Sequence, residues 1–127
     1  MNHRGIVAAG ALLAGTAVLL GAFGAHGLRS LLGAQQLGWW ETAVQYQMWH
    51  GLALLAIAAL RPARANAIAL LMGGGTLIFS GSLYLMALTD MRWLGAITPV
   101  GGTAMILAWL LFAWQAFRAP QEGLDHS

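Results

Sequence analysis

Four long apolar runs, separated by short polar segments, dominate the pattern of the chain. They cover residues of about 6–28, 42–60, 67–88 and 94–117, and each is close to the roughly 20 residues that cross a bilayer core. Within a bilayer the backbone polar groups must bond to one another, which runs of this length achieve as helices. The first run lies where a secretory signal would, but its length and the three later runs favour a span. The pattern therefore predicts an all-α, four-helix transmembrane bundle.

This bundle is expected to form one domain, residues 1–118, followed by a mobile polar tail over residues 119–127. The connector before the second run has an amphipathic pattern and ends in Trp39 and Trp40, two residues typical of membrane interfaces. We therefore expect a short interfacial helix there, continuing into the second span.

The arginines predict the orientation of the bundle. With four spans both termini lie on one side, and four of the six arginines fall on that side. The positive-inside rule then makes both termini cytoplasmic. The four are Arg4, Arg61, Arg64 and Arg118, and the other two are Arg29 and Arg92.

Composition supports a membrane protein and narrows its chemistry. The chain is 59% hydrophobic and only 8% charged, whereas soluble domains have about 25% charged residues. Its net charge of +2 comes from scattered arginines, so no nucleic-acid partner is expected. It has no cysteine, which excludes disulfides and thiolate chemistry. The expected partners are the lipid bilayer and, through helix contacts, further copies of the chain or other membrane proteins.

One stretch inside a span is strongly polar, ETAVQYQMWH at residues 41–50. On a helix its polar side chains form one broad flank, and His50 lies about 10 Å deeper than Thr42. Two interpretations remain open. The side chains bond to neighbouring helices, at about 0.6 kcal/mol each, or they line a binding site or water-filled cavity. In either case burial favours a neutral His50 ring.

His26 ends the first span on the side where the second begins, so His26, Glu41 and His50 could converge. Two histidines and one carboxylate are a weak basis for a metal site, which needs three or four ligands in fixed geometry. We expect no metal, no cofactor and no catalytic residues, because no nucleophile–base spacing or zinc motif occurs. The candidate binding residues are His26, Glu41, Gln45, Tyr46, Gln47 and His50.

Small residues recur along the spans, and in lipid they allow helices to approach closely. Gly21, Gly74 and Gly81 are the candidate helix-packing positions. A shift of 60 residues also superposes parts of the two halves, for example Trp49 on Trp109. This is consistent with an internal duplication, although chance matches are common in such a composition.

Four blocks carry a family resemblance: GAFGAHGL (21–28), AVQYQMWHGLALL (43–55), FSGSLYLMAL (79–88) and LGAITPVGGTAMILAWLL (94–111). They resemble the domain of unknown function 423 family. Its members are small four-span bacterial inner-membrane proteins, with eukaryotic relatives called transmembrane protein 256. The resemblance implies a multi-pass protein of the bacterial inner membrane and no particular activity.

Two functional hypotheses follow. The first is a structural or accessory membrane protein acting through helix–helix contacts, favoured by the small residues and the lack of a catalytic constellation. The second is a small transporter or channel-like protein for a solute, ion or lipid, working as an oligomer, favoured by the polar stretch.

Overall fold

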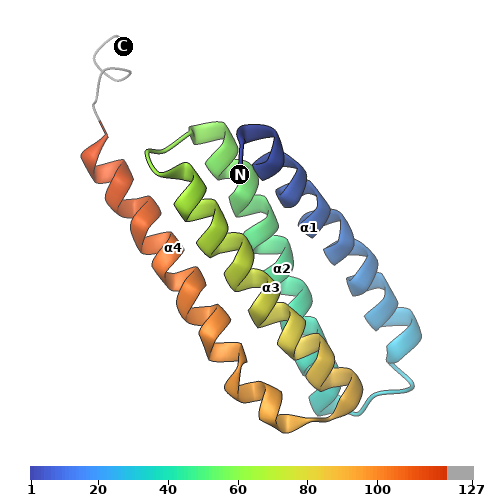
Figure 1. Ribbon diagram of the computed structural model, residues 1–127. Coiled ribbons are helices and arrows are strands. Elements are labelled where there is room, and N and C mark those ends of the chain that lie inside the picture. The colour runs from blue at the N-terminus through green and yellow to red at the C-terminus, as the bar shows by residue number, and fades with distance from the viewer. Residues whose placement is uncertain (120–127) are drawn as a thin grey trace.

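The computed structural model describes residues 1–119 and forms a bundle of four long helices (Figure 1). The helices are α1 (His3–Phe23), α2 (Ala34–Leu60), α3 (Ala65–Thr89) and α4 (Thr98–Arg118). Each of the four is long and apolar enough to cross a membrane, which confirms the all-α four-span prediction. After Ala119, the tail predicted over residues 119–127 lies outside the described residues.

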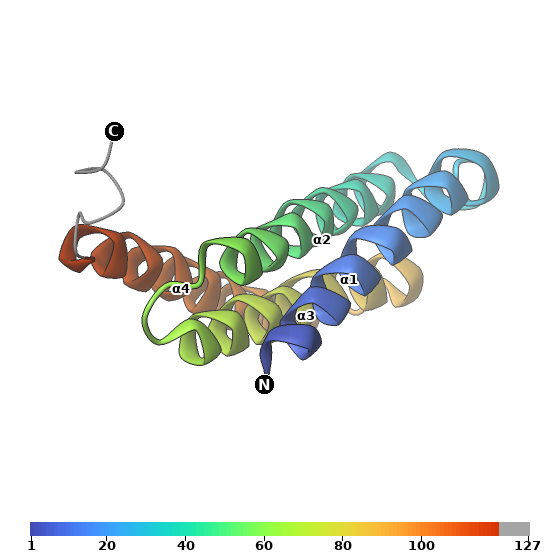
Figure 2. The same ribbon diagram turned by 90° about the horizontal axis from the view of Figure 1, so that it is seen from above.

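Each helix packs along the next one in the chain, so α2 and α3 lie in the middle and α1 and α4 lie at the edges (Figures 1 and 2). The start of α1 and the end of α4 lie at the same end of the bundle. We call this the terminal end, and the opposite end the far end. The cytoplasmic location of the terminal end stays a prediction from the arginines.

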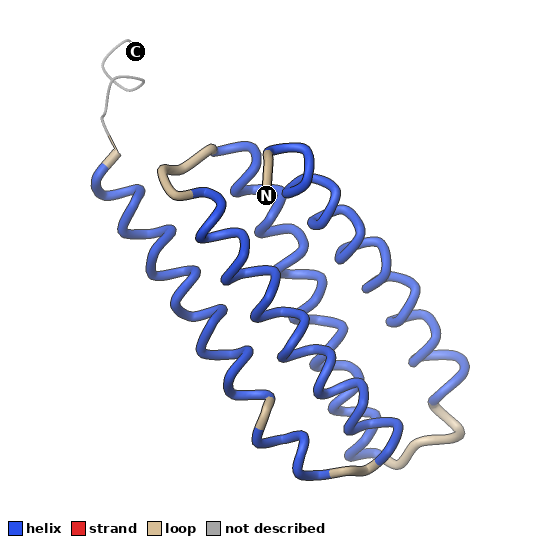
Figure 3. The backbone as a smooth tube through the Cα atoms, viewed as in Figure 1, coloured by secondary structure: helices blue, strands red, loops and turns tan. Residues whose placement is uncertain are grey.

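Short connectors join the helices (Figure 3). Asn2 caps α1 by accepting a hydrogen bond from the Gly5 N–H at 2.8 Å. Helix α2 ends as predicted before Pro62, which cannot continue a helix. Its last turn is closed by Arg61, whose backbone is left-handed with φ of 50°. At the far end of α1 a π-helical turn, Gly24–Leu28, extends the helix.

The helix predicted before the second span does continue into that span. Residues 34–40 form the first two turns of α2, which runs unbroken from Ala34 to Leu60. Trp40, predicted as an interfacial anchor, is only 4% exposed, so its ring faces the bundle and not the lipid headgroups. Its depth in the membrane stays a prediction. Its ring packs edge-on against Tyr84 of α3, with ring centroids 4.6 Å apart. This burial in the bundle holds the first turns of α2 in line with the rest.

Close helix crossings occur at glycines. A Cβ on Gly10 of α1 would lie 2.8 Å from the Gly51 carbonyl oxygen of α2. A Cβ on Gly75 of α3 would lie equally close to the Gly101 carbonyl oxygen of α4. Neither pair tolerates a larger residue without a shift of the helices, as expected for packing in lipid. Helix α3 also continues through three consecutive glycines, because within a bilayer the backbone polar groups must bond to one another.

Candidate functional site

The polar stretch 41–50 lies on α2 and is split between two environments. Gln47 and His50 are buried, at 5% and 6% exposure, and Tyr46 is half-buried. Glu41 and Gln45 lie on the exposed side of the helix. The candidate residues therefore do not form one site.

Gln47 is the centre of a hydrogen-bonded cluster that joins three helices. Its Nε2 donates to the Leu13 carbonyl oxygen at 2.9 Å and to Thr16 Oγ1 at 2.6 Å, both on α1. Its Oε1 accepts a hydrogen bond from the Tyr84 hydroxyl of α3 at 2.6 Å. Both amide hydrogens are thus used within the chain. The arrangement is that of an interhelical contact in lipid.

A second group of contacts surrounds Trp40. Its Nε1–H donates to the Leu20 carbonyl oxygen of α1 at 2.8 Å. A Cβ on Gly24 would lie 2.6 Å from the indole, so only glycine fits there. Gly24 is also the first residue of the π-helical turn, a feature common at functional sites. Here the turn provides room for Trp40.

His50 bonds to the chain through both ring nitrogens. Nδ1 lies 2.8 Å from the Tyr46 carbonyl oxygen, which can only accept, so Nδ1 carries the hydrogen. Nε2 is then free to accept from the Trp109 Nε1–H of α4, at 3.1 Å. Tyr46 stacks on the imidazole at a centroid distance of 5.8 Å. The lone pair of Nε2 is thus engaged by the Trp109 N–H, so the neutral ring offers no free lone pair to a metal or a proton.

The structure does not bring His26, Glu41 and His50 together. His26 is exposed in the π-helical turn, while His50 is buried towards α4. Glu41 and Gln45 line a small hollow of about 200 Å³ between α1 and α2, without His26. Across residues 1–119 no three His, Asp or Glu side chains gather in a way that could hold a metal ion.

The three predicted packing glycines have different surroundings. A Cβ on Gly21 would meet Val44 of α2 at 3.2 Å, so this position receives a neighbouring helix. A Cβ on Gly74 or Gly81 would meet nothing within 4 Å. Within residues 1–119 no helix packs against these two glycines, and the helix packing predicted for them stays a prediction.

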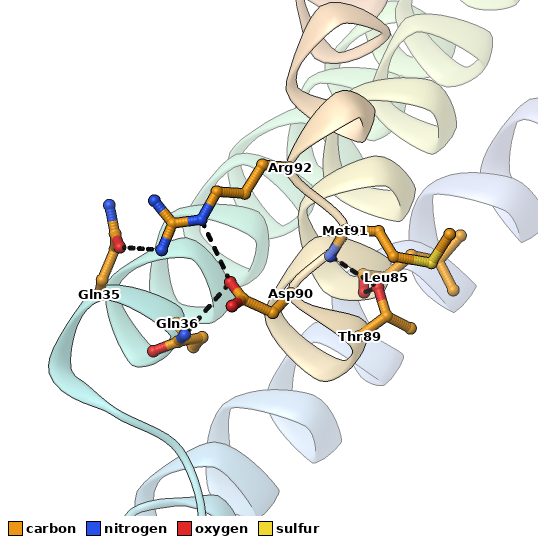
Figure 4. Close-up of polar contacts among 7 residues, drawn as sticks. All are labelled: Gln35, Gln36, Leu85, Thr89, Asp90, Met91 and Arg92. Atoms are coloured by element: carbon orange, nitrogen blue, oxygen red, sulfur yellow. Dashed lines mark hydrogen bonds and ion pairs between the residues drawn. The ribbon is translucent and has the colours of Figure 1, made fainter.

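Sequence reasoning missed a polar cluster at the far end (Figure 4). Arg92 donates to Gln35 Oε1 at 2.9 Å and pairs with Asp90 at 3.5 Å. Gln36 donates to the same Asp90 oxygen at 3.3 Å. These contacts link the start of α2 to the connector before α4, where the 3₁₀-helix Arg92–Ala96 lies. The two glutamines gave no signal in the sequence beyond their polarity.

Comparisons with known proteins identify relatives over most of the chain. Residues 20–102 match a family described as "protein of unknown function (DUF423)". The UPF0382 membrane protein of Staphylococcus saprophyticus is 48% identical over 112 residues, which are 86% of this chain and 93% of the relative. The UPF0382 inner membrane protein YgdD of Escherichia coli is 39% identical over 113 residues, 86% of each chain. No solved structure matches the chain.

Proposed function

The chain belongs to the DUF423 family of proteins of unknown function, and we propose that it is a structural or accessory protein acting through helix–helix contacts. It is a multi-pass protein of the bacterial inner membrane. Its contacts in this proposal are with further copies of the chain or with other membrane proteins.

One observation carries the proposal. Every buried side-chain nitrogen or oxygen among residues 1–119 has a hydrogen-bond partner inside the chain. Polar groups that guide a solute or ion across a membrane face a water-filled cavity, whereas Gln47 and His50 bond to neighbouring helices. The deep polar groups are therefore better explained as contacts that fix the bundle.

What the chain offers to other molecules is its outer surface. The edge helices α1 and α4 are the least covered by the rest of the bundle. Val18 on α1 and Leu110 on α4 are 60% and 62% exposed. In a bilayer such faces can associate with other helices through close packing.

Single-cysteine crosslinking tests the proposal, and the chain contains no cysteine to interfere. Val18→Cys and Leu110→Cys are made separately in the full chain and oxidised in native membranes. The matched control is Leu54→Cys, whose side chain is fully buried in the bundle. We expect a specific crosslinked product from at least one outer position and none from the control.

Liposomes containing the purified chain test the transport alternative. We expect leakage of entrapped ions and small solutes no faster than from empty liposomes, for the chain and for His50→Ala. Flux that the unmodified chain supports and His50→Ala loses would refute the structural role. Absence of crosslinks from both faces of the bundle would refute the contact proposal itself.

A further inference from the structure

Three hollows whose chemistry changes along the bundle lie between α1 and α3. The first lies at the terminal end, has a volume of about 240 Å³ and is bordered by polar residues. They include Asn2, His3, Arg61 and Asn66. Cationic and hydrogen-bonding groups at the membrane surface suit a lipid headgroup.

The second hollow is larger, about 520 Å³, and is lined almost entirely by apolar and small residues. It shares Met1 with the first hollow, so the two adjoin. Ala69, Gly73 and Gly74 form part of the α3 wall. Because these residues are small and α1 packs on α2 and barely touches α3, the space between α1 and α3 stays open.

The third hollow, about 250 Å³, shares Leu13, Thr16 and Leu77 with the second and reaches Gln47 and Tyr84. The series thus runs from a polar mouth at the surface into a long apolar space in the membrane, which ends beside the hydrogen-bonded pair Gln47 and Tyr84. This is the order of polarity along a phospholipid. An unfilled space of this kind loses dispersion contacts, which a hydrocarbon chain restores.

Among residues 1–119 the charge at the mouth is unbalanced. The only acidic residues among residues 1–119 are Glu41 and Asp90, and Asp90 lies in the far-end cluster with Arg92. Arg61 therefore has no carboxylate partner within the part of the chain that the structure describes. Basic pockets between transmembrane helices recognise anionic headgroups.

We propose that the gap between α1 and α3 binds one anionic phospholipid, with its phosphate at Arg61 and an acyl chain beside Gly74. The lipid fills the space that α1 and α3 leave between them. This inference does not depend on the accessory role proposed above, because it concerns a different surface and a different partner.

The headgroup contact is tested on the full chain purified in mild detergent. Native mass spectrometry measures the one-to-one complex with phosphatidylglycerol and with phosphatidylcholine of the same acyl chains. One arginine near the membrane surface is worth about 1 kcal/mol towards an anionic lipid, or about fivefold in affinity. We expect Arg61→Asn to lose about fivefold in phosphatidylglycerol binding, while phosphatidylcholine binding stays the same.

Arg61→Asn also suits the backbone. Arg61 has a left-handed conformation with φ of 50°, which asparagine adopts more readily than arginine. Arg64→Asn is the matched control, because Arg64 lies in the same connector with φ of 59° but does not border the hollow. We expect Arg64→Asn to retain most of the phosphatidylglycerol binding. Arg61→Lys should also retain phosphatidylglycerol binding.

The acyl-chain contact is tested by filling the second hollow. A Cβ on Gly74 meets nothing within 4 Å, so Gly74→Leu enters the hollow without displacing backbone. Gly15→Leu is its control, because Gly15 is equally open but lies outside the three hollows. Both changes raise helix propensity, yet only Gly74→Leu should reduce phosphatidylglycerol binding.

Several outcomes overturn the proposal. Equal binding of the two lipids, or equal losses in Arg61→Asn and Arg64→Asn, would indicate general attraction to the bilayer surface. Displacement of phosphatidylglycerol by inorganic phosphate at constant ionic strength would indicate a site for a soluble anion. If Gly74→Leu breaks a dimer and leaves lipid binding unchanged, a helix of a second copy occupies the gap. If only Arg61→Asn reduces binding, the lipid lies on the other side of Arg61, next to α4.

Discussion

Replacing Gln47 by leucine removes the three hydrogen bonds that join α2 to α1 and α3. Interhelical hydrogen bonds in membranes average about 0.6 kcal/mol each, so the three together contribute about 2 kcal/mol. Leucine has nearly the same bulk and fits an apolar setting, so the loss is chiefly that of the bonds. We expect Gln47→Leu to lower the free energy of unfolding by about 2 kcal/mol, a factor of about 30 in the equilibrium constant.

The measurement is reversible unfolding of the full chain in mixed micelles with increasing dodecyl sulfate, followed by tryptophan fluorescence. Trp40 is a suitable reporter because its ring packs on Tyr84, the hydroxyl partner of Gln47. Gln45→Leu is the matched control, with the same substitution two residues away on the exposed side of α2. Surface substitutions change stability by less than about 0.5 kcal/mol.

The double-mutant cycle with Tyr84→Phe isolates one of the bonds. Tyr84→Phe removes only the hydroxyl that donates to Gln47 Oε1. The coupling energy between the two changes should be close to the single-bond average of about 0.6 kcal/mol. If Gln47→Leu is no less stable than Gln45→Leu, the cluster does not stabilise the bundle. The claim that the polar stretch serves packing then loses its main support.

Three further changes test other contacts, each by unfolding in the same micelles. Gly51→Ala should lower the free energy of unfolding by about 1–3 kcal/mol, because the new Cβ would lie 2.9 Å from the Ala14 nitrogen. The control Gly38→Ala should not destabilise the bundle, because a Cβ there meets nothing within 4 Å. His50→Ala should lower the free energy of unfolding by about 1–3 kcal/mol, since the Trp109 N–H loses its buried acceptor. An unchanged midpoint of the unfolding transition would contradict this expectation. Arg92→Ala should lower the free energy of unfolding by less than about 1 kcal/mol, because its contacts at the far end are exposed. A larger loss of stability would contradict a surface role for Arg92.

The sequence predicted the number of spans and the end of α2 because both depend on local features. A run of about 20 apolar residues forms a helix in lipid whatever its neighbours are. Pro62 ends a helix through its own ring geometry. Gly10 and Ala14 both lie at the close contact with Gly51 of α2, because small residues at four-residue spacing share one face of a helix.

The partners of the polar residues could not be predicted in the same way. His50 meets Trp109 across 59 residues, and Arg92 meets Gln35 across 57. Periodicity identifies the face of a helix on which a side chain lies, not the helix that this face meets. Trp40 shows the same limit. A tryptophan near the start of a span is typical of an interface, and its burial depends on the space that Gly24 leaves on α1.

The order of the helices leaves two gaps, one between α2 and α4 and one between α1 and α3. The two gaps are lined by different kinds of side chain. Between α2 and α4, large side chains meet, with the Trp109 ring edge-on to His50 at 5.9 Å. Between α1 and α3, the wall beside the largest hollow is built from Ala69, Gly73 and Gly74. Of the three consecutive glycines, Gly75 receives α4 and a Cβ on Gly73 would contact Leu54 of α2 at 3.7 Å, whereas a Cβ on Gly74 would meet nothing within 4 Å. At Gly74 a space remains that no side chain of the bundle fills. The small residues of this α3 wall are therefore what keeps the gap between α1 and α3 open.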